Sequence, residues 1–250
     1  EAPRSLCSSF TRKETHSMRN THAKKTKCKI ILSGNTLEIF EYQISVHYNF
    51  DVLPVKHSRE LTQTERDKNR ARSRARAHKM VQWLVTSNFG LWYDQFNKPY
   101  MAKFLTLTFS EDIQNVKDGN PHFTLFIKRL NYALFKVKKT MLRYLAVIEF
   151  QPKSGRVHYH VLLFNLPFIE RSRYPAVFQE SWGQGFIWVN RKKNERKIAN
   201  YMTKYMTKEN DDRLIGQKRY FFSRGLYRPA FVMNELMANG IKDFMKKERA

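Results

Sequence analysis

The sequence predicts an α+β fold in which helices flank a central, mostly antiparallel β-sheet. From residue 103 to residue 209, the pattern of apolar residues indicates a strand, a helix, a two-stranded hairpin and a second helix. The hairpin strands are separated only by "PKSG", and so short a connection joins antiparallel strands. Hydrophobic residues make up 42% of the 250 residues and include 19 Phe, 12 Tyr and 4 Trp, enough to fill a core.

Residues 1–59 are predicted to form a basic N-terminal extension. Its first 27 residues are polar and lack a hydrophobic period, so we expect a loose arm. Residues 28–33 and 37–48 have the composition of strands, and the turn residues "SGN" lie between them. The extension is therefore expected to contain a β-hairpin.

Residues 60–88 lack proline and end before Gly90, a combination that predicts a helix. The first half of this segment is almost entirely charged and the second half is apolar. It contains four arginines at a spacing of two, which places neighbouring side chains about 200° apart around the helix. A solvated helix end and a surface that contacts phosphate both explain this run. The four residues are Arg70, Arg72, Arg74 and Arg76.

Residues 60–250 are assigned to a second domain, whose chemical motifs lie between residues 100 and 228. Alternation predicts strands in this domain, and a spacing of three to four between apolar residues predicts helices. The expected elements are a strand at 103–109, an amphipathic helix at 121–138 that starts with Pro121, strands at 143–151 and 156–164, an aromatic loop containing "SWGQGFIWV", and a helix at 194–209.

The charge of the chain points to a polyanionic partner. There are 46 Lys and Arg against 22 Asp and Glu, which gives a net charge of +24. Nucleic acid is the favoured partner, and an anionic membrane surface is the alternative. No apolar run is long enough to span a bilayer, so we expect no membrane insertion and a cytoplasmic protein. Cys7 and Cys28 form no CxxC pair, which argues against a zinc ribbon.

Two histidines two residues apart suggest a metal site. His158 and His160 lie in one expected strand, so both point to the same face of the sheet. If the hairpin turns through "PKSG", Glu149 lies directly opposite His158 on that face, ~5 Å away at Cβ. One carboxylate and two imidazoles suit Mn²⁺ or Mg²⁺. The alternative is a buried Glu–His pair without a metal.

A four-residue unit, Tyr-Met-Thr-Lys, occurs twice in succession in the last expected helix. Tyr201 and Tyr205 lie one turn apart on one helix face, and Lys204 and Lys208 form a second pair with the same spacing. A tyrosine can attack a phosphodiester, and a nearby lysine stabilises negative charge. The alternative is that both tyrosines belong to an apolar stripe and pack in the core.

Three motifs occur in the order found in one family of enzymes. They are the strand "FLTLTF" (104–109), "HYH" (158–160) with Glu149 on the neighbouring strand, and the doubled "YMTK" (201–208). In this respect the chain resembles the HUH endonucleases, in particular the two-tyrosine rolling-circle replication initiators of plasmids and single-stranded DNA phages. The resemblance covers roughly residues 100–228 and leaves the first 98 residues unmatched.

This resemblance implies an HUH nuclease fold and site-specific nicking of single-stranded or origin-hairpin DNA. A tyrosine, Tyr201 or Tyr205, becomes joined to the 5′-phosphate, and Lys204 and Lys208 assist. It also implies a divalent ion, Mg²⁺ or Mn²⁺, held by Glu149, His158 and His160. The chain has no phosphate-loop motif, so a host helicase and a host polymerase are the expected partners in a bacterial cytoplasm. The candidate DNA contacts are Arg70, Arg72, Arg74, Arg76, Lys103, Arg156 and Arg224.

Two other functions fit the same residues. A conjugative relaxase or a transposase shares this chemistry and differs in its DNA substrate. A non-enzymatic nucleic-acid-binding protein is the second alternative, because basic and aromatic side chains together suit the binding of phosphates and the stacking of bases.

Overall fold

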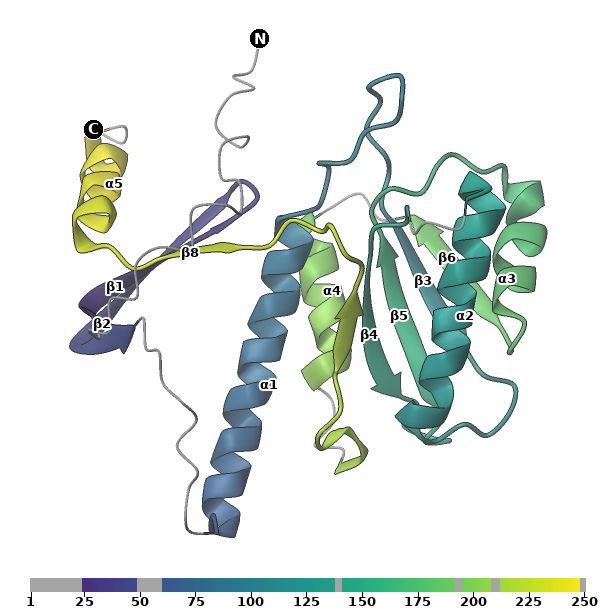
Figure 1. Cartoon of the computed structure of the whole chain (residues 1–250), viewed down its shortest axis with the longest axis horizontal. Coiled ribbons are helices and arrows are strands. Elements are labelled where there is room, and N and C mark those ends of the chain that lie inside the picture. The colour runs from purple at the N-terminus through teal and green to yellow at the C-terminus, as the bar shows by residue number, and fades with distance from the viewer. Residues whose placement is uncertain (1–23, 49–59, 138–140, 192–194, 208–211, 248–250) are drawn as a thin grey trace. The chain divides into compact units, whose positions relative to one another are not determined.

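The structure is a computed structural model that describes residues 24–48, 60–137, 141–191, 195–207 and 212–247. It confirms the α+β fold, with one sheet of three strands and one of five (Figure 1). The chain divides into two compact units, and the larger consists of Ile31–Glu38 and Leu61–Phe231. The other described residues belong to the smaller unit. Within the described ranges, every helix is too short or too polar to cross a bilayer.

The strands are β1 (Lys24–Ser33), β2 (Thr36–Tyr48), β3 (Lys103–Thr108), β4 (Tyr144–Phe150), β5 (Val157–Leu163), β6 (Ile187–Arg191), β7 (Tyr220–Phe222) and β8 (Ala230–Val232). The α-helices are α1 (Gln63–Thr86), α2 (Val116–Phe135), α3 (Glu180–Trp182), α4 (Glu195–Thr207) and α5 (Glu235–Lys247). Three short turns of other helix types complete the set: η1 (Arg171–Arg173), η2 (Pro175–Gln179) and η3 (Asp212–Leu214).

The expected N-terminal hairpin is confirmed by β1 and β2, which lie in a sheet of order β2-β1-β8. In the smaller unit, Cys28 and Ile30 of β1 pack with Ala238 of α5. The Glu235 carboxylate accepts a hydrogen bond from the backbone N–H of Lys27. Because β1 begins at Lys24, the expected loose arm is wrong for its last four residues, and residues 1–23 lie outside the described ranges.

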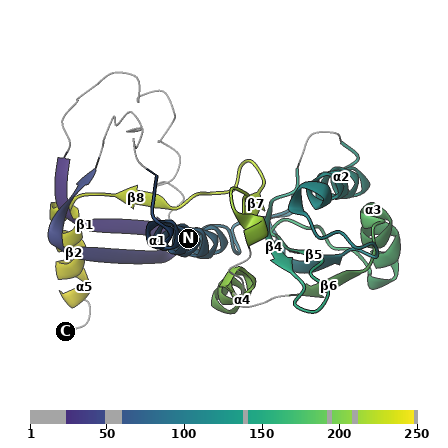
Figure 2. The ribbon, with the colours of Figure 1, turned by 90° about the horizontal axis from the view of Figure 1, so that it is seen from below.

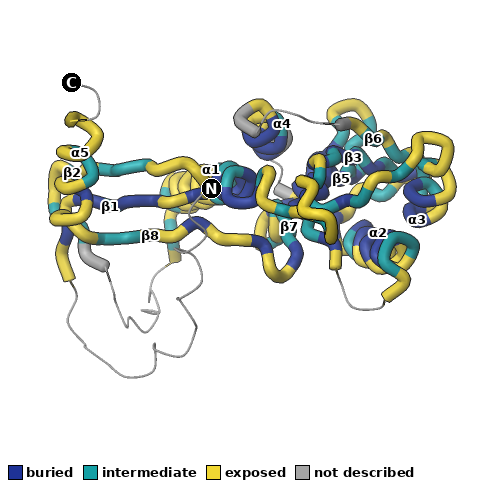
Figure 3. Tube along the Cα trace, turned by 90° about the horizontal axis from the view of Figure 1, so that it is seen from above, coloured by how far each residue is buried: buried dark blue, intermediate teal, exposed yellow. Residues whose placement is uncertain are grey.

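The five-stranded sheet of the larger unit has the order β6-β3-β5-β4-β7, and every neighbouring pair is antiparallel. Its two faces carry separate apolar clusters because side chains alternate along each strand. One face packs against α2, η2 and α3, and the other packs against α1 and α4. Figure 2 shows α2 and α4 on opposite faces, and Figure 3 shows each of them buried on one side and exposed on the other.

Helix α1 begins where the sequence supplies a capping box. The Glu65 backbone N–H donates to the Thr62 hydroxyl, and the Thr62 backbone N–H donates to the Glu65 carboxylate at 2.9 Å. The buried residues of α1 all lie in its last six, from Val81 onward, which matches the expected change from charged to apolar. Near this end, the Trp83 indole N–H donates to Glu38 at 2.7 Å, so the tip of the first hairpin is fastened to α1.

Two expectations for the larger unit are wrong. The second helix does not start with Pro121: α2 begins at Val116, because the Asn115 side chain accepts the Lys117 N–H at 2.9 Å and caps it there. Pro121 lies inside this helix, where its ring removes one N–H group but keeps a helical φ. The expected aromatic loop contains β6, which pairs with the edge of β3.

The turn between β4 and β5 is tightly held. Gln151 N–H donates to the Arg156 carbonyl at 2.8 Å, and Gly155 has φ +71°, a value that favours glycine. The Arg213 guanidinium donates to the Gly155 carbonyl at 2.8 Å and lies 3.7 Å from the Phe150 ring centroid. A residue that follows α4 therefore holds this turn from outside.

Replacing Gly155 with alanine is expected to lower the free energy of unfolding by about 1 kcal/mol, because a Cβ at positive φ is strained. Gly155→Asn should lose less, since asparagine tolerates this conformation. Urea unfolding followed by tryptophan fluorescence measures this in the larger unit, which contains all four tryptophans. Equal stability of the alanine variant and the wild type would contradict the prediction.

Candidate active site

The predicted register of the β4–β5 hairpin is confirmed. Glu149 pairs with His158, and Val147 pairs with His160. Paired residues of antiparallel strands point to the same face, and residues two apart on one strand do so too. Glu149, His158 and His160 therefore share one face of the sheet, which is the face covered by α1 and α4.

Glu149 and His160 form a buried pair. Their side chains are only 8% and 4% exposed, and Nε2 of His160 lies 2.6 Å from Oε2 of Glu149. An ionised carboxylate only accepts, so His160 Nε2–H donates to it. On the other side of the ring, Nδ1 lies 3.2 Å from the Thr106 hydroxyl. Both nitrogens of the imidazole therefore have a partner.

His158 lies beside this pair and is half-buried. Burial lowers the pKa of His158, and the neighbouring His160 and Arg156 lower it further, while Glu149 acts in the opposite direction. A histidine with a lowered pKa is neutral at pH 7. Neutral imidazole is the form that binds metal ions.

The donor types fit a divalent ion, because a carboxylate and two imidazoles on one face suit Mn²⁺. Their arrangement differs from a metal centre. Within the described ranges, no three side chains from His, Cys, Asp and Glu converge closely enough to hold a metal. Glu149 would have to exchange its contact with His160 for the ion. A metal bound by these three residues thus remains a prediction.

Tyr201 reaches the same face from α4. The buried stripe of this helix consists of Ile198, Ala199, Met202, Thr203 and Met206. Tyr201 flanks that stripe and is half-buried. Its ring meets Phe104 edge-on, with 4.9 Å between centroids, and the other neighbour of Phe104 is the His160 ring, stacked at 5.7 Å. One phenylalanine ring therefore contacts both the histidine and the tyrosine.

The rest of the doubled unit is only partly described. Lys204 is an exposed residue of α4. Tyr205 belongs to the same helix, but its side chain lies outside what the structure describes, and so does the whole of Lys208. The predicted roles of these residues stay predictions.

The predicted DNA contacts lie in different places. Arg156 directly precedes β5, where it lowers the pKa of His158, and it pairs with Asp112 at 3.5 Å. Lys103 pairs with Leu163, on the sheet face opposite the two histidines, and donates to the Tyr174 hydroxyl at 3.2 Å.

The other basic residues lie away from the histidines. Arg224 follows β7, and its carbonyl accepts from Arg143. Arg70, Arg74 and Arg76 line a cleft of about 720 Å³, whereas Arg72 is exposed outside its lining.

Phe104 and Thr106 complete the site, although the sequence did not single them out. Both lie in β3 on the face of His160, since Thr106 pairs with His160 and Phe104 is two residues away. The motif strand itself was the available signal. Assigning these side chains required the pairing of β3 with β5, two strands separated by all of α2 and β4.

The chain resembles replication-associated proteins. Residues 102–210 match the model of a family of replication-associated proteins of the ORF2 type. The Replication-associated protein ORF2 of Spiroplasma virus 4 is 29% identical over 165 residues, which cover 58% of this chain and 48% of that relative. The chain thus spans about half the length of this relative. No solved structure gives a significant match. The segment matched to the family runs from β3 through α4 and so contains the buried pair, His158 and Tyr201.

Glu149→Ala is expected to lower the free energy of unfolding by about 3 kcal/mol, because it leaves His160 buried without its carboxylate. Glu149→Gln should lose only about 1 kcal/mol, since the amide oxygen still accepts from Nε2–H. Urea titration in metal-free buffer at pH 7 compares the two variants. Equal losses would show that the contact at 2.6 Å does not contribute to stability.

Proposed function

We propose that this protein is a phage-type replication initiator that nicks and rejoins single-stranded DNA through a 5′-phosphotyrosine intermediate. Its resemblance to replication-associated proteins and its charge of +24 support the choice of DNA as substrate. One observation carries the proposed chemistry: Phe104 contacts both His160 and Tyr201. The buried acid–histidine pair and the tyrosine helix are therefore on the same face of one sheet.

In the proposed reaction, the phenol oxygen of Tyr201 or Tyr205 attacks phosphorus. A bond forms between this oxygen and phosphorus, and the bond from phosphorus to the 3′-oxygen breaks. The phenol gives up its proton, and the departing 3′-oxygen takes one up to become a free hydroxyl. The second tyrosine of α4, four residues from the first, would accept the strand in a later transfer. Lys204 and Lys208 would stabilise the negative charge that develops on phosphate and phenolate.

The proposed metal ligands are Glu149, His158 and His160. A bound Mg²⁺ or Mn²⁺ would polarise a phosphate oxygen. The neutral state of His158, which its lowered pKa supports, leaves a nitrogen lone pair available. We further propose that the protein acts in a bacterial cytoplasm with a host helicase and a host polymerase.

One observation favours a second function, that of a nucleic-acid-binding protein without catalysis. Glu149 and His160 already satisfy one another, and Tyr201 packs edge-on against Phe104. Both are ordinary features of a hydrophobic core. A relaxase or a transposase would use the same residues as the proposed initiator and would differ in the DNA it cuts.

A covalent adduct tests the proposed function. Incubation with circular single-stranded DNA and Mn²⁺ should give a protein–DNA adduct that survives denaturing electrophoresis. Tyr201→Phe should reduce strand transfer in part, and Tyr201→Phe combined with Tyr205→Phe should leave none. Tyr132→Phe is the matched control, because Tyr132 is an exposed tyrosine of α2, on the opposite face. An adduct formed by the double variant would refute the assignment of the nucleophiles.

Thermal melting with and without Mn²⁺ tests the metal ligands independently of activity. Mn²⁺ should raise the Tm of the wild type, since a ligand that binds only the folded state stabilises it. His158→Ala should lose this shift and still fold, because the half-buried His158 lies outside the Glu149–His160 contact. His122→Ala, at a half-buried histidine of α2, should keep the shift. An equal shift in both variants would exclude His158 as a ligand.

A further inference from the structure

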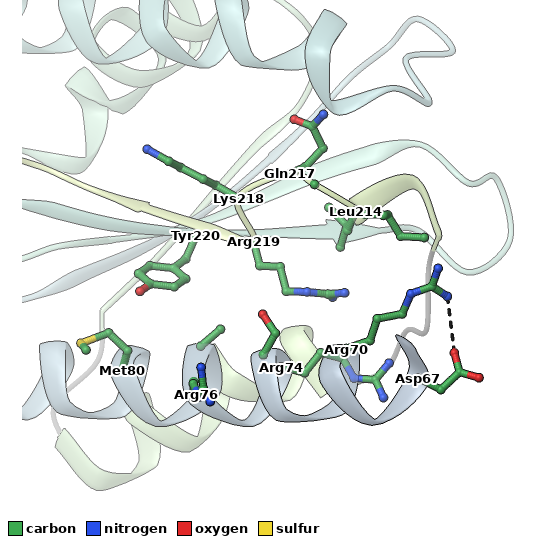
Figure 4. Close-up of a pocket in the computed structure, with 14 residues that line it drawn as sticks. Asp67, Arg70, Arg74, Arg76, Met80, Leu214, Gln217, Lys218, Arg219 and Tyr220 are labelled. Carbon is green, nitrogen blue, oxygen red and sulfur yellow. Dashed lines mark ion pairs between the residues drawn. The ribbon is translucent and has the colours of Figure 1, made fainter. Parts of the chain in front are cut away.

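A basic cleft lies between α1 and the segment Leu214–Tyr220 of the larger unit (Figure 4). Its volume is about 720 Å³. One wall is the first half of α1, and the other is the chain from the end of η3 to the start of β7, from which Arg219 extends toward α1. Every residue that lines the cleft lies outside residues 102–210, the segment that matches the replication-associated family.

The lining of the cleft combines positive charge with an aromatic ring. It contains five basic side chains and a single acidic one, Asp67, which lies 3.6 Å from Arg70. Tyr220 lines the cleft as well and stacks on Phe222 with 6.2 Å between centroids. Basic grooves with aromatic platforms are typical of sites for single-stranded nucleic acid. The basic residues are Arg70, Arg74, Arg76, Lys218 and Arg219.

The cleft is connected to the candidate active site through the sheet. Tyr220 pairs with Val147 across β7 and β4, and Val147 pairs with His160 across β4 and β5. Because paired residues share a face, Tyr220 lies on the face of His160, and it packs in the same apolar cluster as Tyr201. A strand that left the cleft at Tyr220 would therefore meet the surface that carries the proposed nucleophile.

We propose that this cleft binds the phosphodiester backbone of single-stranded DNA next to the segment that reacts. The guanidinium groups would contact phosphates, and Tyr220 would stack against a base. The cavity has the size of a site for a small ligand, so it accepts a few nucleotides of a single strand. A duplex, whose major groove alone is about 12 Å wide, is too broad to enter. The choice of DNA rests on the proposed function, whereas the position of the site does not.

The test removes two positive charges from inside or outside the cleft. Arg70→Gln with Arg74→Gln removes them from the lining, on one face of α1. Lys68→Gln with Arg72→Gln removes the same charge at the same spacing from exposed residues that do not line the cleft. Glutamine preserves helix propensity in both, and circular dichroism verifies the fold. Lys218→Gln removes one charge from the opposite wall without touching α1.

Binding of a fluorescent oligodeoxynucleotide is measured from 50 to 300 mM NaCl in EDTA, with both tyrosines of α4 replaced by phenylalanine. The logarithm of affinity against that of salt concentration should lose about 1.4 in slope for the Arg70/Arg74 pair and about 0.7 for Lys218→Gln. The Lys68/Arg72 pair should change the slope by less than half as much as the Arg70/Arg74 pair. Equal losses from the two pairs would overturn the cleft in favour of a generally basic helix.

Two further outcomes separate this proposal from the proposed function. A matched duplex that is bound as tightly as the single strand, with the same loss on replacing Arg70 and Arg74, would overturn the preference for a single strand. Because binding is measured without metal and without the tyrosines, failure to form an adduct leaves the result for the cleft intact. An adduct together with unchanged salt slopes would support the nickase and refute the cleft.

Discussion

The pairing of β4 with β5 is the constraint on which the candidate active site depends. Glu149 belongs to one strand and both histidines belong to the other, so only the register of the hairpin brings them to one face. A slip of one residue would turn Glu149 toward the core beneath α2. The positive φ of Gly155 and the hydrogen bond between Gln151 and Arg156 fix the turn and with it the register.

The same face must also bury the apolar side of α4, and Phe104 meets both requirements. Its ring fills the space between the histidine and the helix, where it stacks on His160 and meets Tyr201 edge-on. Packing against a rigid ring, rather than a hydrogen bond, thus fixes how far the tyrosine lies from the histidine. The phenol keeps its hydroxyl for chemistry while its ring contributes to the apolar cluster.

The sequence was sufficient wherever the determinants are local. Hairpin register follows from a four-residue turn, so the position of Glu149 opposite His158 could be predicted. The pairing of β3 with β5 brings together residues 54 apart in the chain, as in the contact between Thr106 and His160, and no local pattern encodes it. The start of α2 was mispredicted because the Asn115 cap outweighs the usual preference of proline for the first turn. The closed contact between Glu149 and His160 depends on side-chain torsions, which periodicity does not describe.

The way the ends of α4 are fastened has a mechanical consequence. Before the helix, β6 is hydrogen-bonded along β3, and after it, Arg213 is bonded to the turn between β4 and β5. Both attachments are to the sheet that carries the two histidines. If a DNA strand is joined to Tyr201 and then pulled by an advancing motor, the force passes through both ends of α4 into a β-sheet. Strand hydrogen bonds then share the load, and the helix is not held by its side-chain packing alone.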